Sequence, residues 1–147
     1  MAGLSGKTAL VTGASRGIGR ATALALANAG VRVLVHYGRS KAEAESLVAE
    51  INEGGGRASA ITADLGDADG AVQFANAVRS IVGERLDVLV LNAGISKTAR
   101  IADYTVNDFD NLFATNVRSP FSWFSNSCQC LARDQTSLWS PRLWLAQ

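Results

Sequence analysis

The sequence is poor in cysteine and histidine, and this scarcity excludes four-ligand zinc sites and disulfide frameworks. Its 147 residues include two cysteines, Cys128 and Cys130, and a single histidine, His36. A four-ligand zinc site or a disulfide framework needs more sulfur or more imidazole than this. We therefore expect reduced thiols and no metal site.

The sequence also lacks an excess of charge and any long apolar run. Its 14 lysines and arginines stand against 13 aspartates and glutamates, so no basic field attracts nucleic acid or an anionic membrane. No apolar run approaches the roughly 20 residues of a membrane span, and the N-terminus does not resemble a signal peptide. These absences predict one cytoplasmic domain that binds neither nucleic acid nor a membrane.

The strongest local signal lies in residues 12–19, which read Thr-Gly-Ala-Ser-Arg-Gly-Ile-Gly. They join an apolar run at residues 8–11 to a helical stretch whose apolar positions share one face, namely Ile18, Ala21, Thr22, Ala25, Leu26 and Ala29. Residues without a Cβ atom let backbone N–H groups approach a phosphate closely, and the helix directs the positive end of its dipole to the same place. The stretch therefore predicts a phosphate-binding turn.

Apolar runs and amphipathic helices alternate as far as residue 91. The runs at residues 31–35, 58–63 and 86–91 predict strands, and a helical period at 41–53 and 67–82 predicts helices. This alternation indicates βαβ units, and hence an α/β fold with a doubly wound (Rossmann) parallel sheet, incomplete at about four strands. Such sheets bind ligands at the carboxyl ends of their strands.

One more helix is predicted beyond this alternating region. Thr105 and Asp108 have the spacing of a capping box, which marks the start of a helix. Phe109, Leu112 and Phe113 continue its period towards residue 117. The helix would carry Asn116 near its end.

Four motifs then occur in the order and spacing of one family. The glycine turn reads Gly13-x-x-x-Gly17-x-Gly19; the other motifs are Asp64-Leu65 after the third strand, Asn92-Ala93-Gly94 after the fourth, and Asn116 in the helix that follows. Together they resemble the short-chain dehydrogenase/reductases, such as the 3-oxoacyl carrier-protein reductases, over roughly the first 120 residues. Taken singly, Asp64 could cap the next helix, Asn92 could form a plain turn, and Asn116 could be a solvated helix residue. These alternatives do not explain why all four motifs occur together in this order.

The resemblance implies a nicotinamide dinucleotide site built from these motifs and from the end of the second strand. The implied cofactor-binding residues are Gly13, Ser15, Arg16, Gly17, Ile18, Gly19, Arg39, Ser40, Asp64, Leu65, Asn92, Ala93 and Gly94. It also implies an oxidoreductase that moves a hydride between the cofactor and a small-molecule carbonyl or alcohol. Asn116 would belong to its catalytic set.

The end of the second predicted strand lacks the acid with which an NAD site binds the ribose hydroxyls. Residues 36–41 read His-Tyr-Gly-Arg-Ser-Lys, and no Asp or Glu occurs between Gly19 and Glu43. Arg39 and Arg16 are instead placed to bind a 2′-phosphate through charge-assisted hydrogen bonds. We therefore predict NADP rather than NAD, the alternative being that both arginines are ordinary surface charges.

The sequence lacks the remainder of the catalytic set that the resemblance implies. That set has a serine, and a tyrosine with a lysine four residues later, on and after a fifth strand that is not recognisable here. The one Tyr-x-x-x-Lys, Tyr37 to Lys41, lies at the end of the second strand, and Ser96 comes one strand too early. With Asn116 as the only remaining member, we expect a chain that binds cofactor without turnover.

The composition changes near residue 121. All three tryptophans lie beyond Pro120, and no glycine follows Gly94. We therefore divide the chain into an NADP-binding Rossmann portion, residues 1–121, and an atypical tail, residues 122–147, with no assignable domain. A shifted reading frame would produce such a truncated, altered end. The alternatives to an oxidoreductase are a nucleotide-binding regulatory fragment and a non-functional frameshifted product.

The missing fifth strand has a consequence for association. Without a neighbour on that side, the run at residues 86–91 would form an apolar sheet edge with unpaired N–H and C=O groups. Exposed edges of this kind pair with other chains. The sequence thus predicts homo-oligomers or aggregation through the fourth strand.

Overall fold

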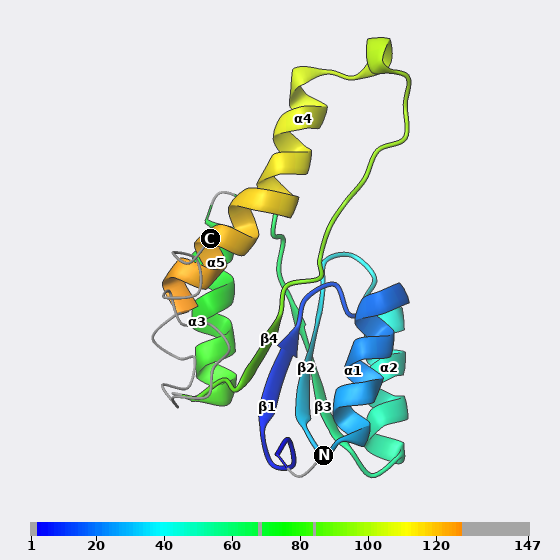
Figure 1. The fold of residues 1–147 in the computed structure, drawn as a ribbon, viewed down its shortest axis with the longest axis vertical. Helices are drawn as coiled ribbons and strands as arrows, with labels where there is room; N and C mark the ends of the chain where they lie inside the picture. The colour runs from blue at the N-terminus through cyan, green and yellow to red at the C-terminus, as the bar shows by residue number, and fades with distance from the viewer. Residues whose placement is uncertain (1–2, 68, 84, 128–147) are drawn as a thin grey trace, which may run out of the picture.

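The computed structural model describes residues 3–67, 69–83 and 85–127, in which strands and helices alternate (Figure 1). The elements are β1 (Thr8–Val11), α1 (Gly17–Asn28), β2 (Arg32–Tyr37), α2 (Lys41–Glu53), β3 (Arg57–Thr62), α3 (Gly70–Val82) and β4 (Val88–Val90). The four strands form a parallel sheet in the order β3-β2-β1-β4. The predicted α/β fold with a Rossmann-type sheet is confirmed.

Strand β1 lies inside the sheet, between β2 and β4. Its Leu10 pairs with Leu34 of β2 and with Leu89 of β4, and Leu10 and Leu34 are fully buried. Strands covered on both faces are apolar on both sides, which explains why these runs show no alternation of polar and apolar residues. Because the strands are parallel, their carboxyl ends lie along one edge of the sheet, where the sequence motifs follow them.

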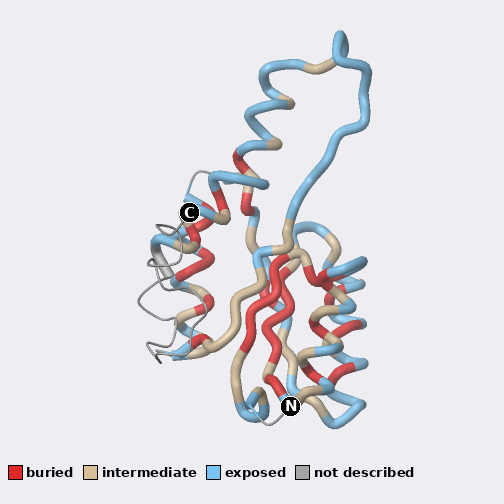
Figure 2. The backbone as a smooth tube through the Cα atoms, in the orientation of Figure 1, coloured by how far each residue is buried: buried red, intermediate tan, exposed pale blue. Residues whose placement is uncertain are grey.

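Helices cover both faces of the sheet, and the buried residues lie along β1 and β2 and on the sides of the helices that pack against the sheet (Figures 1 and 2). One core cluster joins β1 and β2 to α1 and α2, and a second joins the other face to α3. Helix α1 buries Gly19, Ala23 and Ala27, whereas Ile18 is 79% exposed. The predicted helix face was therefore wrong for the exposed Ile18, Ala21 and Ala25, although Leu26 does pack against the core. Small side chains let α1 lie close to the strands.

The other elements follow the predicted pattern with shifted ends. Helix α2 spans the predicted residues 41–53 and buries Ala44, Leu47 and Ile51. Helix α3 begins at Gly70, after Asp69, and not at Asp67, and β4 keeps three residues of the predicted run. Leu86 is still only 1% exposed, so that run contributes to the core before its strand begins.

Beyond β4 the chain leaves the sheet as an arm (Figure 1). A 3-10 helix, η1 (Ile101–Asp103), precedes α4 (Val106–Phe113), the π-helical turn η2 (Ala114–Arg118) and α5 (Ser119–Ser127). The predicted capping box is present, because Thr105 Oγ1 accepts the Asp108 N–H at 3.1 Å and Asp108 Oδ2 accepts the Thr105 N–H at 3.0 Å. Helix α4 projects beyond the sheet, and α5 returns to contact α3.

Helix α5 crosses the composition change at residue 121. Its Trp123 is 1% exposed and packs against Phe74 of α3, with 5.9 Å between the ring centroids. The core therefore includes a residue from beyond the proposed boundary. Cys128, Cys130 and the rest of the chain to residue 147 lie outside the described residues, so the expectations for the thiols and the tail stay predictions.

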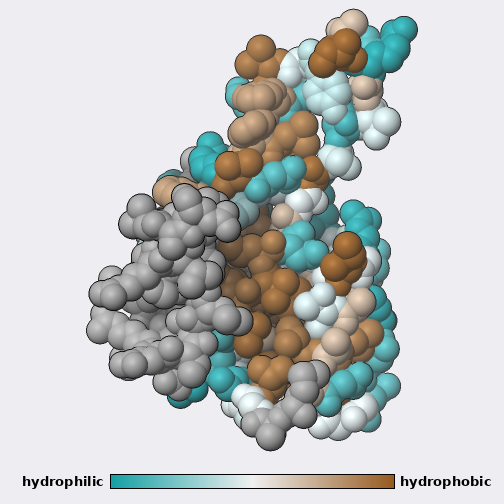
Figure 3. All heavy atoms as spheres, in the orientation of Figure 1, coloured by the Kyte–Doolittle hydropathy of each residue, from teal (hydrophilic) through white to brown (hydrophobic). Residues whose placement is uncertain are grey.

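The arm and the sheet edge expose apolar side chains. An apolar stripe follows the helical spacing along the arm and consists of Val106, Phe109, Phe113, Val117 and Phe121, all about half exposed or more. Figure 3 shows apolar side chains along α4 and over the β4 edge. None of the described helices combines the length and the apolar character that a membrane crossing requires.

Candidate cofactor site

The glycine turn leaves the carboxyl end of β1 and is held by β2. The Gly13 N–H donates to Nδ1 of His36 at 3.1 Å, and the Ala14 N–H donates to the His36 carbonyl oxygen at 2.9 Å. Both bonds are made inside the protein, so these N–H groups are not available to a ligand. The N–H groups that can bind an anion therefore come later in the turn.

Among the described residues, no side chain caps the first turn of α1. Arg16 is the N-cap residue, and no acidic residue lies in the first turn of the helix. The first N–H groups of a helix lack intrahelical acceptors, and the helix dipole places positive potential there. The N–H groups of Gly17, Ile18 and Gly19 thus form an uncapped anion-binding end.

Two glycines explain why the start of α1 has free space on one side and packs closely on the other. Gly17 has φ of 58°, and a Cβ atom there would meet nothing within 4 Å, so the space beside it is free. A Cβ on Gly19 would lie 2.4 Å from the Gly13 carbonyl oxygen and 2.6 Å from Nδ2 of Asn92. Gly17 leaves room for a ligand, whereas Gly19 lets α1 meet the turn and the end of β4.

Thr12 joins the glycine turn to the Asn92-Ala93-Gly94 segment. Its Oγ1 accepts the N–H of Asn92 at 2.9 Å and that of Ala93 at 3.0 Å, and it donates to the Val90 carbonyl at 3.2 Å. Asn92 Nδ2 returns two bonds, to the carbonyl oxygens of Thr12 at 3.1 Å and Gly13 at 3.2 Å. Asn92 is therefore more than a plain turn residue, and Thr12 is a site residue that sequence reasoning missed.

Asn116 lies in η2 and pairs with the residue that follows Gly94. Its Oδ1 accepts the Ile95 N–H at 2.8 Å, and its Nδ2 donates to the Ile95 carbonyl at 2.9 Å. The side chain is thus bonded to the chain after β4, which argues against the alternative of a purely solvated helix residue. The structure brings Asn116 and the Asn92-Ala93-Gly94 segment together.

Asp64 and Leu65 follow β3 and form a tight loop. Asp64 Oδ1 accepts the Gly66 N–H at 2.8 Å, and Arg118 donates to the Gly66 carbonyl at 2.9 Å, so η2 also holds this loop. Leu65 is 8% exposed. Helix α3 has Asp69, not Asp64, at its N-cap, which removes the alternative that Asp64 caps this helix.

The two arginines assigned to the cofactor phosphate are exposed and unpaired. Arg16 precedes α1, and Arg39 follows β2 directly before Ser40, the N-cap residue of α2. Within the described part of the chain, neither guanidinium has an ion-pair partner, whereas the nearby Lys41 pairs with Glu45 at 3.6 Å. Both positive charges remain free for an anion.

The two tyrosines lie elsewhere. Tyr37 ends β2, two strands away from β4, and packs against the core beside α1 and α2. Tyr104 is on the arm, where its hydroxyl donates to the Lys97 carbonyl and Lys97 Nζ lies 5.7 Å from its ring centroid. Lys97 is engaged in turn, because its Nζ lies 2.6 Å from Asp108 Oδ2. Neither tyrosine joins Asn116, and Ser96 makes no hydrogen bond among the described residues.

Lys97 also lowers the pKa of the capping residue Asp108. The hydrogen bond from Lys97, with those from Thr105, lowers the pKa of Asp108 to about 2. Asp108 therefore stays ionised at neutral pH and serves the start of α4. This cluster on the arm is structural.

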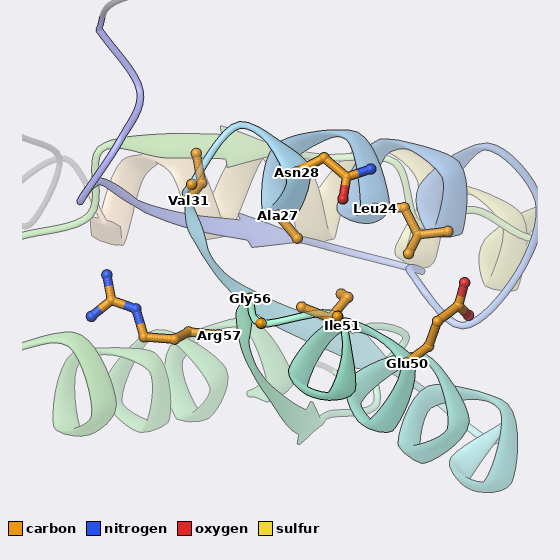
Figure 4. Close-up of a pocket in the computed structure, with 11 residues that line it drawn as sticks. Leu24, Ala27, Asn28, Val31, Glu50, Ile51, Gly56 and Arg57 are labelled. Carbon is orange, nitrogen blue, oxygen red and sulfur yellow. The ribbon is translucent and has the colours of Figure 1, made fainter.

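A pocket of about 670 Å³ lies at the other end of the sheet, between the ends of α1 and α2 (Figure 4). Ala27, Val31 and Ile51 form its apolar part, with Glu50 and Arg57 at its sides. It adjoins the starts of β2 and β3, not their carboxyl ends. It is thus separate from the glycine turn.

The family follows from comparison with known proteins. The family model described as short chain dehydrogenase matches residues 7–137. The chain belongs to this family. The chain is 41% identical over 120 residues to a trihydroxynaphthalene reductase of Colletotrichum orbiculare, covering 82% of the chain and 42% of that relative. It is also 41% identical over 121 residues to a 3-oxoacyl-(acyl-carrier-protein) reductase of Synechocystis, covering 82% and 49%.

Solved structures resemble the chain in the same region. The landomycin C-6 ketoreductase LanV, with bound NADP and rabelomycin, matches with a TM-score of 0.81 and 37% identity, over 87% of this chain and 54% of that chain. A short chain dehydrogenase from Burkholderia cenocepacia in complex with NADP matches with a TM-score of 0.82 and 40% identity, over 88% and 52%. The chain spans about half the length of the curated relatives it matches.

Proposed function

We propose that this chain binds NADP(H) at the carboxyl edge of its sheet. The observation that carries the proposal is the uncapped start of α1 beside the open space at Gly17. A dinucleotide pyrophosphate is an anion of the kind that such a helix end binds. The residues present therefore fit the cofactor, and the neighbours LanV and the Burkholderia enzyme were solved with NADP.

The assigned residues would contact the cofactor from the ends of all four strands. Gly13 and Ser15 to Gly19 would surround the pyrophosphate, with the exposed Ile18 against the cofactor. Arg16, Arg39 and Ser40 would hold the 2′-phosphate, because two free guanidinium groups favour NADP over NAD. Asp64 and Leu65 would border the adenine. Asn92, Ala93 and Gly94 would line the nicotinamide side.

The reaction proposed for the family is hydride exchange between the cofactor and a small-molecule carbonyl or alcohol. When bound, the nicotinamide supplies or accepts the hydride. The protein must hold a proton at the reacting oxygen, which requires an acid within about 2.6 to 3.2 Å of it. Tyr37 and Tyr104 do not lie with Asn116. We therefore propose cofactor binding without turnover for the chain as printed, with Asn116 as the only member of the catalytic set.

A fluorescence titration with NADPH, paired with a turnover assay on aromatic and acyl ketones, tests both parts. We expect saturable binding and no ketone-dependent oxidation of NADPH. Clear turnover by a homogeneous preparation would overturn the proposed inactivity, and the absence of binding would overturn the cofactor assignment. The variant Arg57→Asp, at the opposite end of the sheet, serves as a charge-matched control for Arg39→Asp.

Two other proposals make different predictions. A nucleotide-binding regulatory fragment would also bind NADPH without turnover, but its binding would change the activity of another protein. A non-functional product of a shifted reading frame would show no cooperative thermal transition. The packing of Trp123 against Phe74 favours a folded chain, so we expect one cooperative transition by circular dichroism.

A further inference from the structure

His36 is a buried polar residue that follows three apolar residues of β2. It is 2% exposed, and its neighbours on β2 are valines, a leucine and Tyr37. Its Nδ1 accepts the Gly13 N–H at 3.1 Å, and its Nε2 lies 3.2 Å from the Ala63 carbonyl oxygen. The ring also packs against Phe74, with 4.7 Å between centroids. Both ring nitrogens therefore have partners.

These partners determine the protonation state of the ring. A backbone N–H can only donate, so Nδ1 must be the unprotonated acceptor, and a carbonyl can only accept, so Nε2 must carry the proton. Burial lowers the pKa of His36 below its ordinary value, although the hydrogen bond to Ala63 acts in the opposite direction. The ring is accordingly neutral at physiological pH. The ionisable residues of the adjoining loops are all exposed, namely Arg16, Arg39, Asp64, Asp67 and Asp69.

The bonds of His36 connect all the segments assigned to the adenosine half of the cofactor. Through Gly13 and Ala14 the residue holds the glycine turn, because its carbonyl also accepts the Ala14 N–H at 2.9 Å. Ala63 directly precedes Asp64, and β2 itself leads to Arg39. A buried ring that merely filled space would need no polar atoms, since unbonded polar groups in a core cost stability.

We propose that His36 is a positioning residue, which sets NADP(H) affinity by holding the glycine turn and the Asp64 loop at a fixed spacing. The proposal rests on the NADP(H) site proposed above and adds a determinant that lies beneath it. Without the Nδ1 acceptor, the Gly13 N–H would be buried without a partner, and the turn would shift to satisfy it. The N–H groups at the start of α1 would then lose their alignment with the pyrophosphate.

Two substitutions separate the hydrogen bonds from the packing. Asn can place Oδ1 near the position of Nδ1, so His36→Asn keeps an acceptor for the Gly13 N–H. His36→Phe keeps a ring of similar size and removes both bonds. We expect His36→Phe to raise the Kd for NADPH about tenfold or more and His36→Asn to stay within about threefold of the original chain. Leu86→Val is the control, because it disturbs the core at the opposite end of the sheet.

The thermal unfolding temperature is measured for every variant beside the Kd. A role limited to stability would make the affinity losses follow the unfolding temperatures, with Leu86→Val also affected, and would overturn the proposal. Unchanged NADPH binding by His36→Phe would overturn it as well. If the unsubstituted chain binds no NADPH, the proposed function fails and the positioning role fails with it.

Nitrogen-15 NMR of the unsubstituted chain provides a test that needs no variant to fold. His36 is the only histidine in the sequence, so its imidazole signals are assigned without ambiguity. We expect the neutral form with the proton on Nε2 between pH 6 and pH 8 and no change of tautomer when NADPH is added. A proton on Nδ1 would overturn the proposal, because that nitrogen could not then accept from Gly13.

Discussion

The side-chain amide of Asn116 pairs with both backbone groups of Ile95, accepting its N–H at 2.8 Å and donating to its carbonyl at 2.9 Å. Gly94 fits beneath this pairing, because a Cβ atom there would lie 3.3 Å from Asn116 Oδ1. Arg118, in the same π-helical turn, holds the loop after β3 through the Gly66 carbonyl. One turn of the arm therefore holds two of the loops assigned to the cofactor.

Asn116→Asp keeps the acceptor for the Ile95 N–H and replaces the donor with an oxygen that faces the Ile95 carbonyl. We expect faster amide hydrogen exchange across residues 91–100 and a several-fold higher Kd for NADPH, since one hydrogen bond is worth about 0.5 to 1.5 kcal/mol. Asn111→Asp, on an exposed position of α4, adds the same charge and should change neither measurement. Equal amide hydrogen exchange in Asn116→Asp and Asn111→Asp would show that the Asn116 side chain does not hold the segment after β4.

Arg39→Asp reverses the charge at the end of β2 and supplies the acid that NAD sites use. We expect NADPH binding to weaken about ten- to a hundredfold and NADH binding to weaken little, because only NADPH carries the 2′-phosphate. Fluorescence titrations with the two cofactors measure the ratio. Equal losses for both cofactors, or a similar effect of Arg57→Asp, would contradict the assignment.

Gly19→Ala introduces a methyl group 2.4 Å from the Gly13 carbonyl oxygen and 2.6 Å from Asn92 Nδ2. The start of α1 must then move away from the turn, so we expect loss of measurable NADPH binding and a destabilisation of about 1 to 3 kcal/mol. Titration and urea unfolding measure the two effects. Gly3→Ala, with nothing within 4 Å of the new methyl group, is the control and should behave as the original chain does.

Asp87 links stability to pH at the start of the sheet. Burial acts to raise the pKa of Asp87, but the hydrogen bonds from the Thr8 N–H, at 2.9 Å, and from Arg85 outweigh it, so the pKa lies below its usual value. The folded state therefore binds this proton less readily than the unfolded state. The stabilisation should be complete above about pH 4, the ordinary carboxyl value, and be lost as the pH falls through the lower folded value.

Urea unfolding at pH 7, pH 4 and pH 3 tests this linkage. In Asp87→Asn the free energy of unfolding should depend less on pH over this range than in the original chain. Asp103→Asn, in an exposed pair with Arg100, serves as the charge-matched control. An identical pH dependence in the original chain and in Asp87→Asn would show that Asp87 contributes nothing to it.

The β4 edge is expected to drive self-association. Leu91, directly after β4, is 39% exposed at an edge that has no neighbouring strand among the described residues. Leu91→Lys places a charge there, which opposes edge-to-edge pairing, so sedimentation should show a larger monomer fraction. Val72→Lys, at a 46% exposed position of α3, should not change that fraction. A monomeric original chain at high concentration would contradict the prediction.

The sequence by itself determined the elements and their order, because these depend on local patterns. The apolar runs and helical periods predicted the parallel sheet, the bounds of α2 and the capping box of Thr105 and Asp108. The motif positions also followed, since parallel strands bring their carboxyl ends to one edge. Predicting these features requires only the residues that lie close to each position along the sequence.

Tertiary structure alone decided which surfaces and side chains meet. The face with Ala23 and Ala27, not that with Ile18, packs on the sheet, because close approach of α1 favours small residues. Thr12 joins the ends of β1 and β4, His36 joins the turn to the loop after β3, and Trp123 enters the core from beyond the composition change. A lone histidine directly after an apolar run was the one visible signal of these contacts. Their partners lie up to 81 positions apart, and no local pattern records a contact across that separation.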